Sequence, residues 1–345
     1  MTMPVSPAAI KRLGAIPNLN VRPSEPLAPH TRFQIGGPAA LFCDTADPNA
    51  LIQALAATDV RLGIPRMIIG GGTNLVVSDT GFDGIVLRYV GSRIRQNGLT
   101  LHVDSGAVLQ DVVDTANALG LMGLQTMTGI PGYLGGAIYG NAGAYGHSIQ
   151  EIVESVEAYD DGCVVTIMNR ECNFRYREST FKDFKDLIII SATLRFEAGD
   201  PVELKKISAG IRAIRDAKYP PTMRCAGSIF KNLFFADLPA RVQSEIPASV
   251  VREGKVPSAW FLEQTGVKGL RRGDIQVASY HANLIYNDGA GTALDLVAVI
   301  QDLKNRVRAR FHIELEEEVQ YLGFECVDAL AAERTGRLVP VVRDY

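Results

Sequence analysis

The sequence lacks a long apolar run, and its charges are nearly balanced. The longest apolar stretches, such as Leu187–Ile190, fall far short of the roughly 20 residues that a membrane helix needs. The 35 basic and 38 acidic residues leave a net charge of -3, which favours neither nucleic acid nor a membrane surface as partner. Residues 1–11 also lack the basic-then-apolar order of a signal peptide. We therefore expect a cytoplasmic protein.

Cysteine and histidine are too few and too scattered for a metal site. The five cysteines include no Cys-x-x-Cys pair, and the five histidines form no cluster with them. This spacing argues against a zinc site and against a disulfide framework, so we expect no metal. It agrees with the reducing environment of a cytoplasm.

Glycine, in contrast, is concentrated in two loops of an otherwise ordinary globular composition. The 345 residues, 47% of them hydrophobic, are enough for two or three domains. The first loop, Gly70-Gly71-Gly72-Thr73-Asn74, follows a predicted strand at 67–69. The second, Gly129-Ile130-Pro131-Gly132, opens a glycine-dense stretch that ends at Gly146.

The first loop suits a ligand that carries phosphate. Glycine lets backbone N–H groups approach a phosphate closely, and Thr73 and Asn74 add side-chain donors. The loop is neither a Gly-x-Gly-x-x-Gly fingerprint nor a Walker loop, which disfavours a Rossmann site and a nucleoside triphosphatase. Taken alone, an ordinary tight turn is an equal interpretation, and the second loop favours a ligand.

Hydrophobic periodicity predicts an α+β protein whose pattern changes near residue 200. The proline-rich residues 1–28 are interpreted as a loosely ordered entry segment, and residues after Phe324 as a tail. Strands are predicted at 67–69, 84–88, 99–103, 153–159, 163–168 and 187–196. Helices are predicted at 108–119, with Asp104-Ser105-Gly106 supplying turn and cap, at 204–214 and at 296–311.

Several motifs occur in an order that resembles a known group of flavoproteins. Besides the glycine loops they are His30–Pro38, Tyr176–Lys182, Gly227–Asn232, Glu263–Gly269, His281–Asn287 and Glu314–Val319. Together they resemble the FAD-binding domain of the vanillyl-alcohol-oxidase superfamily and, within it, the UDP-N-acetylenolpyruvoylglucosamine reductases. Because independent motifs keep their order over about residues 28–324, the resemblance is more specific than any one motif.

The resemblance implies an α+β fold with a two-part FAD-binding domain of the vanillyl-alcohol-oxidase type and a smaller α+β substrate-binding domain. The expected boundaries are an N-terminal extension at 1–28, a FAD-binding domain at 29–200, a substrate-binding domain at 201–325 and a tail at 326–345. The FAD-binding domain would divide into subdomains at about 29–90 and 91–200. We expect a monomer or a small homo-oligomer.

The implied reaction is an NADPH-dependent, FAD-mediated reduction of UDP-N-acetylglucosamine enolpyruvate to UDP-N-acetylmuramate, a step of peptidoglycan precursor synthesis. The FAD is expected to be non-covalent, because no histidine or cysteine stands at a clear attachment position. The residues expected to hold it lie in the two loops and just after the second: Gly70, Gly71, Gly72, Thr73, Asn74, Leu75, Gly129, Ile130, Pro131, Gly132, Gly136 and Asn141.

Three motif residues match the positions that the family uses for catalysis. Negative charge builds on the substrate carboxylate during hydride addition, and Arg177 matches the arginine whose planar fork suits a carboxylate. Ser228 matches the proton-donating serine, a weak acid for which Lys231 is a candidate helper. Glu318 matches the glutamate before valine in the family pattern Glu-Leu-Glu-Pro-Glu-Val-Arg, with Glu316 as the alternative.

The chain departs from that pattern at Glu317 and Gln320, where the family has proline and arginine. It also lacks a tyrosine-bearing loop that some members insert after the strand at 187–196, and Tyr133, Tyr145 or Tyr219 are candidates to replace its contacts. The residues expected to bind the UDP-sugar are Arg215, Lys218, Lys231, Asn232, Lys268 and His281. For His281 a purely structural role is an equal interpretation.

Two alternatives stay open. A flavin oxidase of the same superfamily would use oxygen, but the oxidases carry a different substrate domain, without the motifs around Arg177, Ser228 and Glu318. A flavoprotein that binds a nucleotide sugar without catalysis would have no need to keep all three residues.

Overall fold

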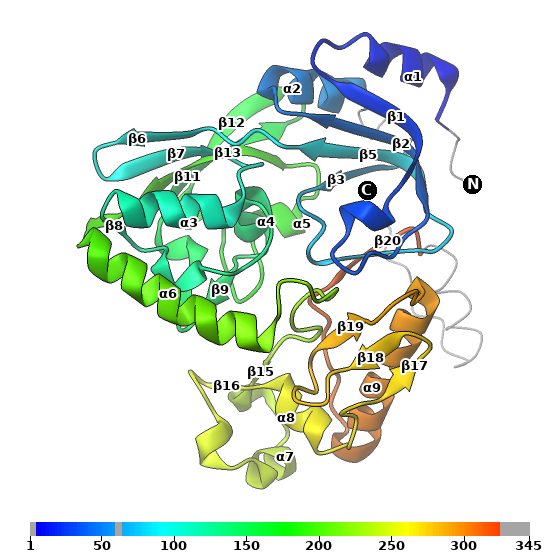
Figure 1. Ribbon diagram of the computed structural model, residues 1–345, viewed down its shortest axis with the longest axis vertical. Helices are drawn as coiled ribbons and strands as arrows, with labels where there is room; N and C mark the ends of the chain where they lie inside the picture. Colours follow the sequence, from blue (N-terminus) through cyan, green and yellow to red (C-terminus); the bar gives the residue numbers. More distant parts are fainter. Residues whose placement is uncertain (1–4, 59–63, 325–345) are drawn as a thin grey trace.

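The computed structural model describes residues 5–58 and 64–324, which fold into three packed parts (Figure 1). The first part is a sheet in the order β1-β2-β5-β3, with β2, β5 and β3 parallel and β1 antiparallel at the edge. Its elements are α1 (Pro7–Gly14), β1 (Asn20–Pro26), β2 (Pro38–Thr45), α2 (Pro48–Ala57), β3 (Arg66–Ile69), β4 (Leu75–Val77) and β5 (Phe82–Tyr89).

The parallel strands of this sheet are apolar on both sides because both faces are covered. On β5, Ile85 and Leu87 join the core under α2, whereas Val86 between them joins a second core with Leu75 and Leu322. A strand that is buried on both faces has no polar alternation, which explains the continuous apolar run. The predicted strands at 67–69 and 84–88 are confirmed.

The prediction of a loosely ordered entry segment is wrong for residues 5–28. Helix α1 begins with Pro7 after the cap residue Ser6, whose side chain accepts a hydrogen bond from the Ala9 N–H. Proline suits this first helical position. Pro23 and Pro26 lie in β1, an edge strand, where a missing N–H is tolerated. The prolines therefore mark a helix start and a sheet edge.

The second part is an antiparallel sheet in the order β12-β11-β13-β7-β6. Its strands are β6 (Ile94–Asn97), β7 (Thr100–Asp104), β11 (Val153–Asp160), β12 (Cys163–Met168) and β13 (Ile188–Arg195). Shorter strands are β8 (Leu121–Met122), β9 (Gly143–Ala144), β10 (His147–Ser148) and β14 (Glu197–Ala198). Its helices are α3 (Leu109–Ala118), α4 (Leu134–Tyr139), α5 (Thr180–Asp183) and α6 (Pro201–Lys218). The strands predicted at 99–103, 153–159, 163–168 and 187–196 are thus confirmed.

The predicted cap of the helix at 108–119 is wrong, although the helix is confirmed as α3. Its cap residue is Val108, which makes no side-chain cap bond. Asp104 instead ends β7 and pairs with Arg93 at 2.9 Å, and the Ser105 hydroxyl donates to the Ile189 carbonyl at 2.8 Å. Tertiary partners therefore take the polar side chains that the sequence offers as caps.

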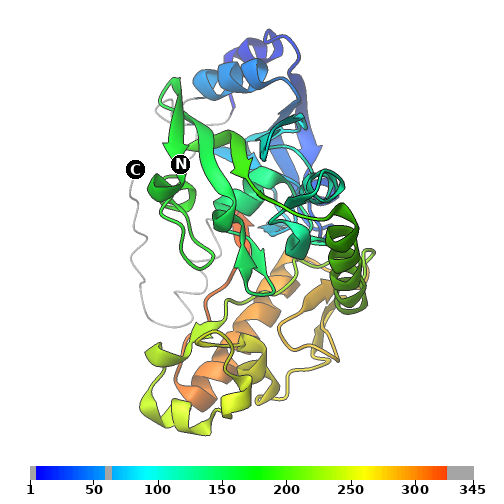
Figure 2. The ribbon, with the colours of Figure 1, turned by 90° about the vertical axis from the view of Figure 1, so that its left-hand side faces the viewer.

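The third part is built around α9, at the opposite end of the molecule from α1 (Figure 2). The apolar face predicted for 296–311 is confirmed, since Leu296, Ile300, Leu303, Val307 and Phe311 are all buried. Around it lie α7 (Ala240–Glu245), α8 (Ser258–Glu263), β15 (Leu233–Phe234), β16 (Lys255–Val256), β17 (Arg271–Arg272), β18 (Ile275–Val277), β19 (Ile285–Asn287) and α9 (Ala293–Phe311).

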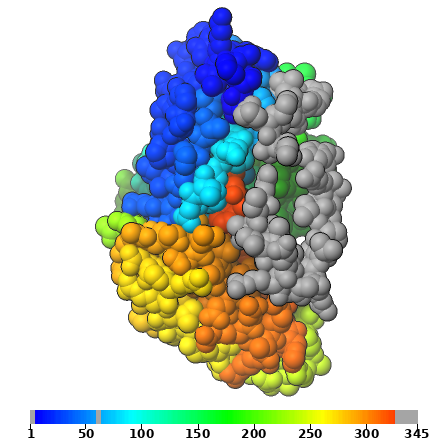
Figure 3. All heavy atoms as spheres, turned by 90° about the vertical axis from the view of Figure 1, so that its right-hand side faces the viewer, coloured from blue at the N-terminus to red at the C-terminus, as the bar shows by residue number. Residues whose placement is uncertain are grey.

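The end of the described chain returns to the first part. Strand β20 (Gln320–Leu322) pairs in parallel with β4, and this red segment lies between the cyan and orange parts in Figure 3. The Asp79 carboxylate accepts hydrogen bonds from the first N–H groups of α9 at Ala293 and Leu294. The third part is therefore fastened to the first. The predicted tail at 326–345 lies outside the described residues, and in the described part of the chain no helix could span a membrane.

Candidate active site

The two glycine loops touch each other across the boundary between the first and second parts. The first loop joins β3 to β4, and the second leads into α4. The Thr73 hydroxyl donates to the Pro131 carbonyl at 3.3 Å, and a Cβ added to Gly71 would lie 3.3 Å from the Gly132 Cα. The loops therefore form one continuous glycine wall of partly exposed backbone, which suits a ligand that contacts main-chain N–H groups.

Gly72 is the position where only glycine fits. Its φ is +61°, and an added Cβ would come within 1.9 Å of the His30 carbonyl oxygen. The Gly72 carbonyl in turn accepts a hydrogen bond from the Arg32 N–H at 3.1 Å. The first loop is thus locked against the His30–Pro38 motif, which explains why both occur together.

A cavity of about 260 Å³ opens beside the first loop. Its lining residues are Pro29, His30, Thr31, Arg32, Gly71, Thr73, Arg88 and Tyr133. Arg88 contacts the His30 ring at 3.0 Å and Asp44 at 2.8 Å, but its Nε is buried with no hydrogen-bond partner among the described residues. Two arginines, an unsatisfied donor and a glycine wall fit the phosphates and flat rings of FAD.

Three residues predicted to hold the cofactor have other contacts. The Asn74 side chain donates to the Glu318 carbonyl at 2.8 Å, and Leu75 pairs with Gln320, so both fasten the last strand. Buried Asn141 donates to the Arg175 carbonyl at 2.8 Å, beneath the Tyr176-Arg177 turn. Of the remaining loop residues, Gly136 faces open space at the start of α4, where nothing would obstruct a ligand.

Arg177 is held in a strained turn. Arg175 and Glu178 exchange backbone hydrogen bonds of 3.0 and 3.1 Å, so Tyr176 and Arg177 form the two-residue tip. Arg177 has a φ of +60°, which costs a side-chain-bearing residue energy. The ammonium of Lys182 donates to its carbonyl at 2.7 Å and stabilises the turn. Such strain at a surface turn is typical of a functional site.

The turn aims Arg177 at the last strand. The guanidinium Nε lies 3.3 Å from Glu318 Oε1, and a terminal nitrogen donates to the Gly143 carbonyl at 3.1 Å. Burial raises the pKa of Glu318 above its ordinary value, and the charge of Arg177 opposes this only in part. A carboxyl that keeps its proton to higher pH can donate a hydrogen bond or a proton.

Ser228 lies near this pair, in a segment of the third part that bridges both Leu284 and the chain around Glu318. It forms a β-bridge with Leu284, and Glu318 donates its N–H to the Ile229 carbonyl at 2.8 Å. The Ser228 hydroxyl lies 3.5 Å from the Tyr219 hydroxyl, a long contact of the kind that tightens when a substrate binds. Tyr219 is therefore the best placed of the three tyrosine candidates.

Asn283 is a residue that sequence reasoning missed. Its buried side chain accepts the N–H groups of Ile229 and Phe230 and donates to the Phe230 carbonyl and the Ser258 hydroxyl. These four bonds fix the backbone beside Ser228. The signal was present in the His281–Asn287 motif, but a polar residue between apolar neighbours does not reveal its partners.

Lys231 forms ion pairs with two carboxylates of the protein. Its ammonium donates to Glu178 at 2.6 Å and to Glu316, and it is only 8% exposed. Burial alone would lower the pKa of Lys231, but the bonds to both glutamates outweigh that effect and raise it. Lys231 thus joins the Arg177 turn to the last strand, and Glu178 is a second residue that sequence reasoning missed.

The backbone N–H of Asn232 donates to the Tyr176 hydroxyl at 3.2 Å, and its side-chain oxygen accepts from the Ser258 N–H at 3.4 Å. The other predicted substrate residues form an outer cationic group. Arg215 packs its side chain against Gly129, and its buried Nε has no hydrogen-bond partner among the described residues. Lys218 lies over the Tyr219 ring at 5.1 Å, and Lys268 pairs with Glu263 at 2.9 Å.

His281 belongs to this outer group. Burial lowers its pKa to about 4, and the charges of Lys218 and Lys268 act in the same direction. The imidazole is therefore neutral near pH 7, and any contact with a phosphate would be a hydrogen bond and not an ion pair.

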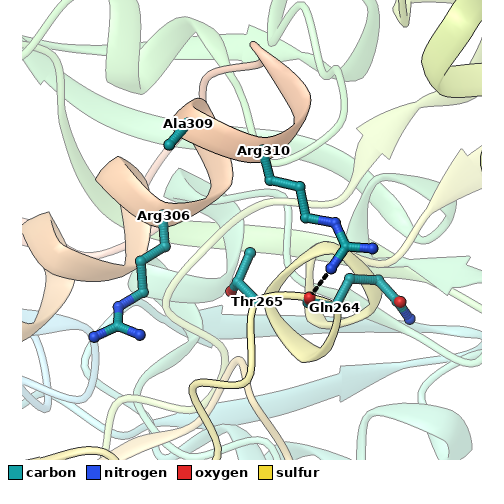
Figure 4. Close-up of a pocket in the computed structure, with 5 residues that line it drawn as sticks. All are labelled: Gln264, Thr265, Arg306, Ala309 and Arg310. Carbon is teal, nitrogen blue, oxygen red and sulfur yellow. Dashed lines mark hydrogen bonds between the residues drawn. The ribbon is translucent and has the colours of Figure 1, made fainter.

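A larger, shallow depression of about 500 Å³ lies on the third part, lined by Gln264, Thr265, Arg306, Ala309 and Arg310 (Figure 4). None of these residues belongs to the glycine loops or to the groups around Arg177. The size of a hollow is a poorer guide than convergent polar groups, so we assign the cofactor to the cavity at the loops and the chemistry to the groups around Arg177.

The glycine loops and the cavity beside them fit FAD, and residues 40–167 match the family model described as "FAD binding domain". This match places the chain among the FAD-dependent oxidoreductases. Residues 219–322 match the model described as "UDP-N-acetylenolpyruvoylglucosamine reductase, C-terminal domain". The chain belongs to the UDP-N-acetylenolpyruvoylglucosamine reductase family. The predicted fold class, an FAD-binding domain of the vanillyl-alcohol-oxidase type with this C-terminal domain, is confirmed.

Relatives support this assignment over nearly the whole chain. The reductase of Solibacter usitatus is 55% identical over 312 residues, which cover 90% of this chain and 100% of the relative. That of Geotalea uraniireducens is 35% identical over 321 residues, covering 91% and 98%. The crystal structure of the Thermus caldophilus reductase is 26% identical, with a TM-score of 0.69 over 88% of this chain and 98% of that one.

Proposed function

We propose that this enzyme reduces UDP-N-acetylglucosamine enolpyruvate to UDP-N-acetylmuramate with NADPH, in the cytoplasm, as a step of peptidoglycan precursor synthesis. The single observation that carries this proposal is the convergence of Arg177, Ser228 and Glu318 beside the glycine loops. Residues 29–200 would hold FAD, as subdomains 29–90 and 91–200, and residues 201–325 the nucleotide sugar. Within the latter range α6 packs on the second part, where its Ser208 hydroxyl accepts from the Asn117 side chain at 2.8 Å. Bound FAD supplies the hydride-transfer chemistry between NADPH and the enolpyruvyl group.

In this proposal Arg177 binds the carboxylate of the enolpyruvyl group. Hydride addition to the vinyl carbon moves negative charge onto that carboxylate, and a fixed cation lowers the barrier to this step. The strained turn and the Gly143 carbonyl orient the guanidinium in advance. Orientation of this kind avoids a reorganisation cost when the charge develops.

Ser228 and Glu318 would manage the proton. Ser228 gives a proton to the carbon that bears the ether oxygen and the carboxylate. A serine is too weak an acid to do this alone, so a second group must return a proton to it. The Tyr219 hydroxyl at 3.5 Å is placed for this task, and the cations of Arg215 and Lys218 over its ring stabilise negative charge there. Glu318, whose pKa is raised by burial, orients the enol form of the substrate.

The outer cations would bind the diphosphate. Arg215 packs against Gly129, Lys218 lies over the Tyr219 ring and Lys268 pairs with Glu263, and these three cations would meet the diphosphate. Lys231 and Asn232 would act indirectly, by fixing the turn that carries Arg177. Neutral His281 would add a hydrogen bond. For the flavin, the loop residues Gly70–Thr73 and Gly129–Gly132 supply backbone contacts, without a covalent link.

Product analysis tests the proposal. Purified holoenzyme, NADPH and UDP-N-acetylglucosamine enolpyruvate should give a nucleotide sugar that has gained two hydrogen atoms by mass spectrometry, with one NADPH consumed for each. Consumption of NADPH only when oxygen is present, with the sugar nucleotide recovered unchanged, would instead identify a flavin oxidase.

A further inference from the structure

The strand segment that carries Glu318 places its neighbours on alternating sides. Ile313, Leu315 and Val319 point into the core of the third part, where all three are buried. Because side chains alternate along an extended chain, Glu317 lies on this same core-facing side, and Glu318 lies on the other. A carboxylate on the apolar side of a strand costs free energy unless it has partners.

Glu317 has two partners. Its Oε1 accepts a hydrogen bond of 2.6 Å from the Lys304 ammonium on α9, and its Oε2 accepts one from the Tyr321 hydroxyl on β20. The side chains of Lys304 and Glu317 are only 20% and 13% exposed, so water screens the pair weakly. The three side chains thus join the last strand to the central helix of the third part.

The backbone at this position explains why proline occurs here in the pattern that the chain otherwise resembles. Phe230 and Glu317 form an antiparallel bridge whose two hydrogen bonds use the N–H groups of Lys231 and Glu318. The N–H of residue 317 therefore stands outside the bridge, and a residue without it would fit. Where the family pattern has proline, whose ring stiffens the backbone, this chain has Glu317, whose side chain is held by Lys304 and Tyr321.

We propose that Lys304, Glu317 and Tyr321 form a clamp that positions Glu318 for substrate reduction. Glu317 is a positioning residue that acts through its neighbour, and the inference rests on the role proposed above for Glu318. Arg177 contacts Glu318 from the opposite side of the strand, at 3.3 Å. If the strand slid or rotated, the carboxyl would move away from the substrate, and a misplacement near 1 Å costs about 10²-fold in rate.

The test separates the two halves of the reaction. In Glu317→Ala, NADPH should bleach the flavin at the wild-type rate under anaerobic conditions, whereas recovery of colour with the enolpyruvyl nucleotide should be about tenfold slower. Lys304→Met breaks the same clamp from the helix and should have the same effect. Glu317→Pro should restore most of the rate, because the ring stiffens the backbone without needing a partner.

Glu314→Ala is the matched control. Glu314 pairs with Arg308, one turn beyond Lys304 on α9, and this pair is exposed to solvent. It should leave both half-reactions unchanged. Equal rates of colour recovery in Glu317→Ala and wild type, or equal slowing in Glu314→Ala, would overturn the clamp. So would a Glu317→Pro variant as slow as Glu317→Ala. Failure of the wild-type enzyme to regain colour with the nucleotide would refute the proposed function instead.

Discussion

The guanidinium Nε of Arg177 lies 3.3 Å from Oε1 of Glu318, although the two residues are 141 positions apart in the sequence. One residue comes from a hairpin turn of the second part, and the other from the strand that returns to β4. A substrate carboxylate would compete with Glu318 for the Arg177 guanidinium. We therefore expect the contact between Arg177 and Glu318 to rearrange when the substrate binds.

Replacing Arg177 tests its role toward the carboxylate. Arg177→Lys keeps the charge but removes the planar fork, so it cannot hold Glu318 and a carboxylate in the same geometry. Colour recovery with the nucleotide should slow by about 10²-fold, in line with the loss of an oxyanion donor. Flavin bleaching by NADPH should not change, as measured by anaerobic stopped flow. Arg175→Lys, which disturbs only the exposed pair with Asp183, is the control and should behave like wild type.

Glu318→Gln should change how stability depends on pH. The pKa of Glu318 is raised in the folded protein, so between its ordinary value near 4.3 and the raised value the folded state binds more protons than the unfolded state. Wild-type stability therefore falls as pH rises through that window, and glutamine removes this loss. The variant should gain in thermal midpoint relative to wild type as pH increases. A difference that does not vary with pH would contradict the raised pKa.

Ser228→Ala and Tyr219→Phe test the proton path. Ser228→Ala should slow colour recovery by about 10²- to 10⁴-fold, the usual range for loss of a general acid, with bleaching intact. Tyr219→Phe removes only the hydroxyl and should slow the same step less. Tyr286→Phe, whose hydroxyl donates to Gln276 within the same cluster, should have no effect. Tyr219→Phe with wild-type rates would exclude Tyr219 from the path.

The lowered pKa of His281 predicts how stability changes in acidic solution. Its pKa is about 4 in the folded protein against an ordinary value of 6.5, so protonation opposes folding. Wild-type stability should decline as pH falls from about 6.5 towards 4, and His281→Asn should remove part of that decline. Unfolding midpoints over this range provide the measurement. Identical pH profiles for the two proteins would show that the imidazole is not desolvated.

Gly72→Ala tests the glycine loop. The added Cβ would meet the His30 carbonyl at 1.9 Å, so the loop must move, and the variant should lose bound FAD and unfold at lower temperature. Gly98→Ala is the matched control, because Gly98 has a similar φ of +57° with nothing within 4 Å of the added Cβ. It should cost only the backbone strain, about 1–2 kcal/mol, and keep its flavin. Equal flavin loss in both would point to strain alone.

Much of this fold could be predicted because apolar periodicity reports burial directly. The face of α9 and four strands of the second sheet were predicted from the apolar pattern, whereas the edge strand β6 was not. The order of prolines and polar residues was less informative. Pro23 and Pro26 fit an edge strand as well as a loop. Asp104 pairs with Arg93 and does not cap the helix that follows it. Local sequence offers such side chains several partners, and tertiary contacts choose among them.

The candidate site shows the same division. Motif order predicted Arg177, Ser228 and Glu318 as catalytic residues, but it could not show that the Lys231 ammonium is bound by Glu178 and Glu316. Nor could it show that Asn74 fastens the last strand or that Glu317 faces α9. These relationships depend on which segments lie side by side, and the partners are 13 to 244 positions apart, so the local sequence carries no signal of their proximity.

Anaerobic reoxidation of the NADPH-bleached enzyme shows whether the reduced flavin passes its electrons to the enolpyruvyl nucleotide. Addition of UDP-N-acetylglucosamine enolpyruvate should restore the flavin absorbance completely and in a single turnover, with a rate that saturates as the nucleotide concentration rises. Absorbance that returns only when oxygen is admitted, at a rate independent of the nucleotide, would show that the enzyme is an oxidase and does not reduce the nucleotide.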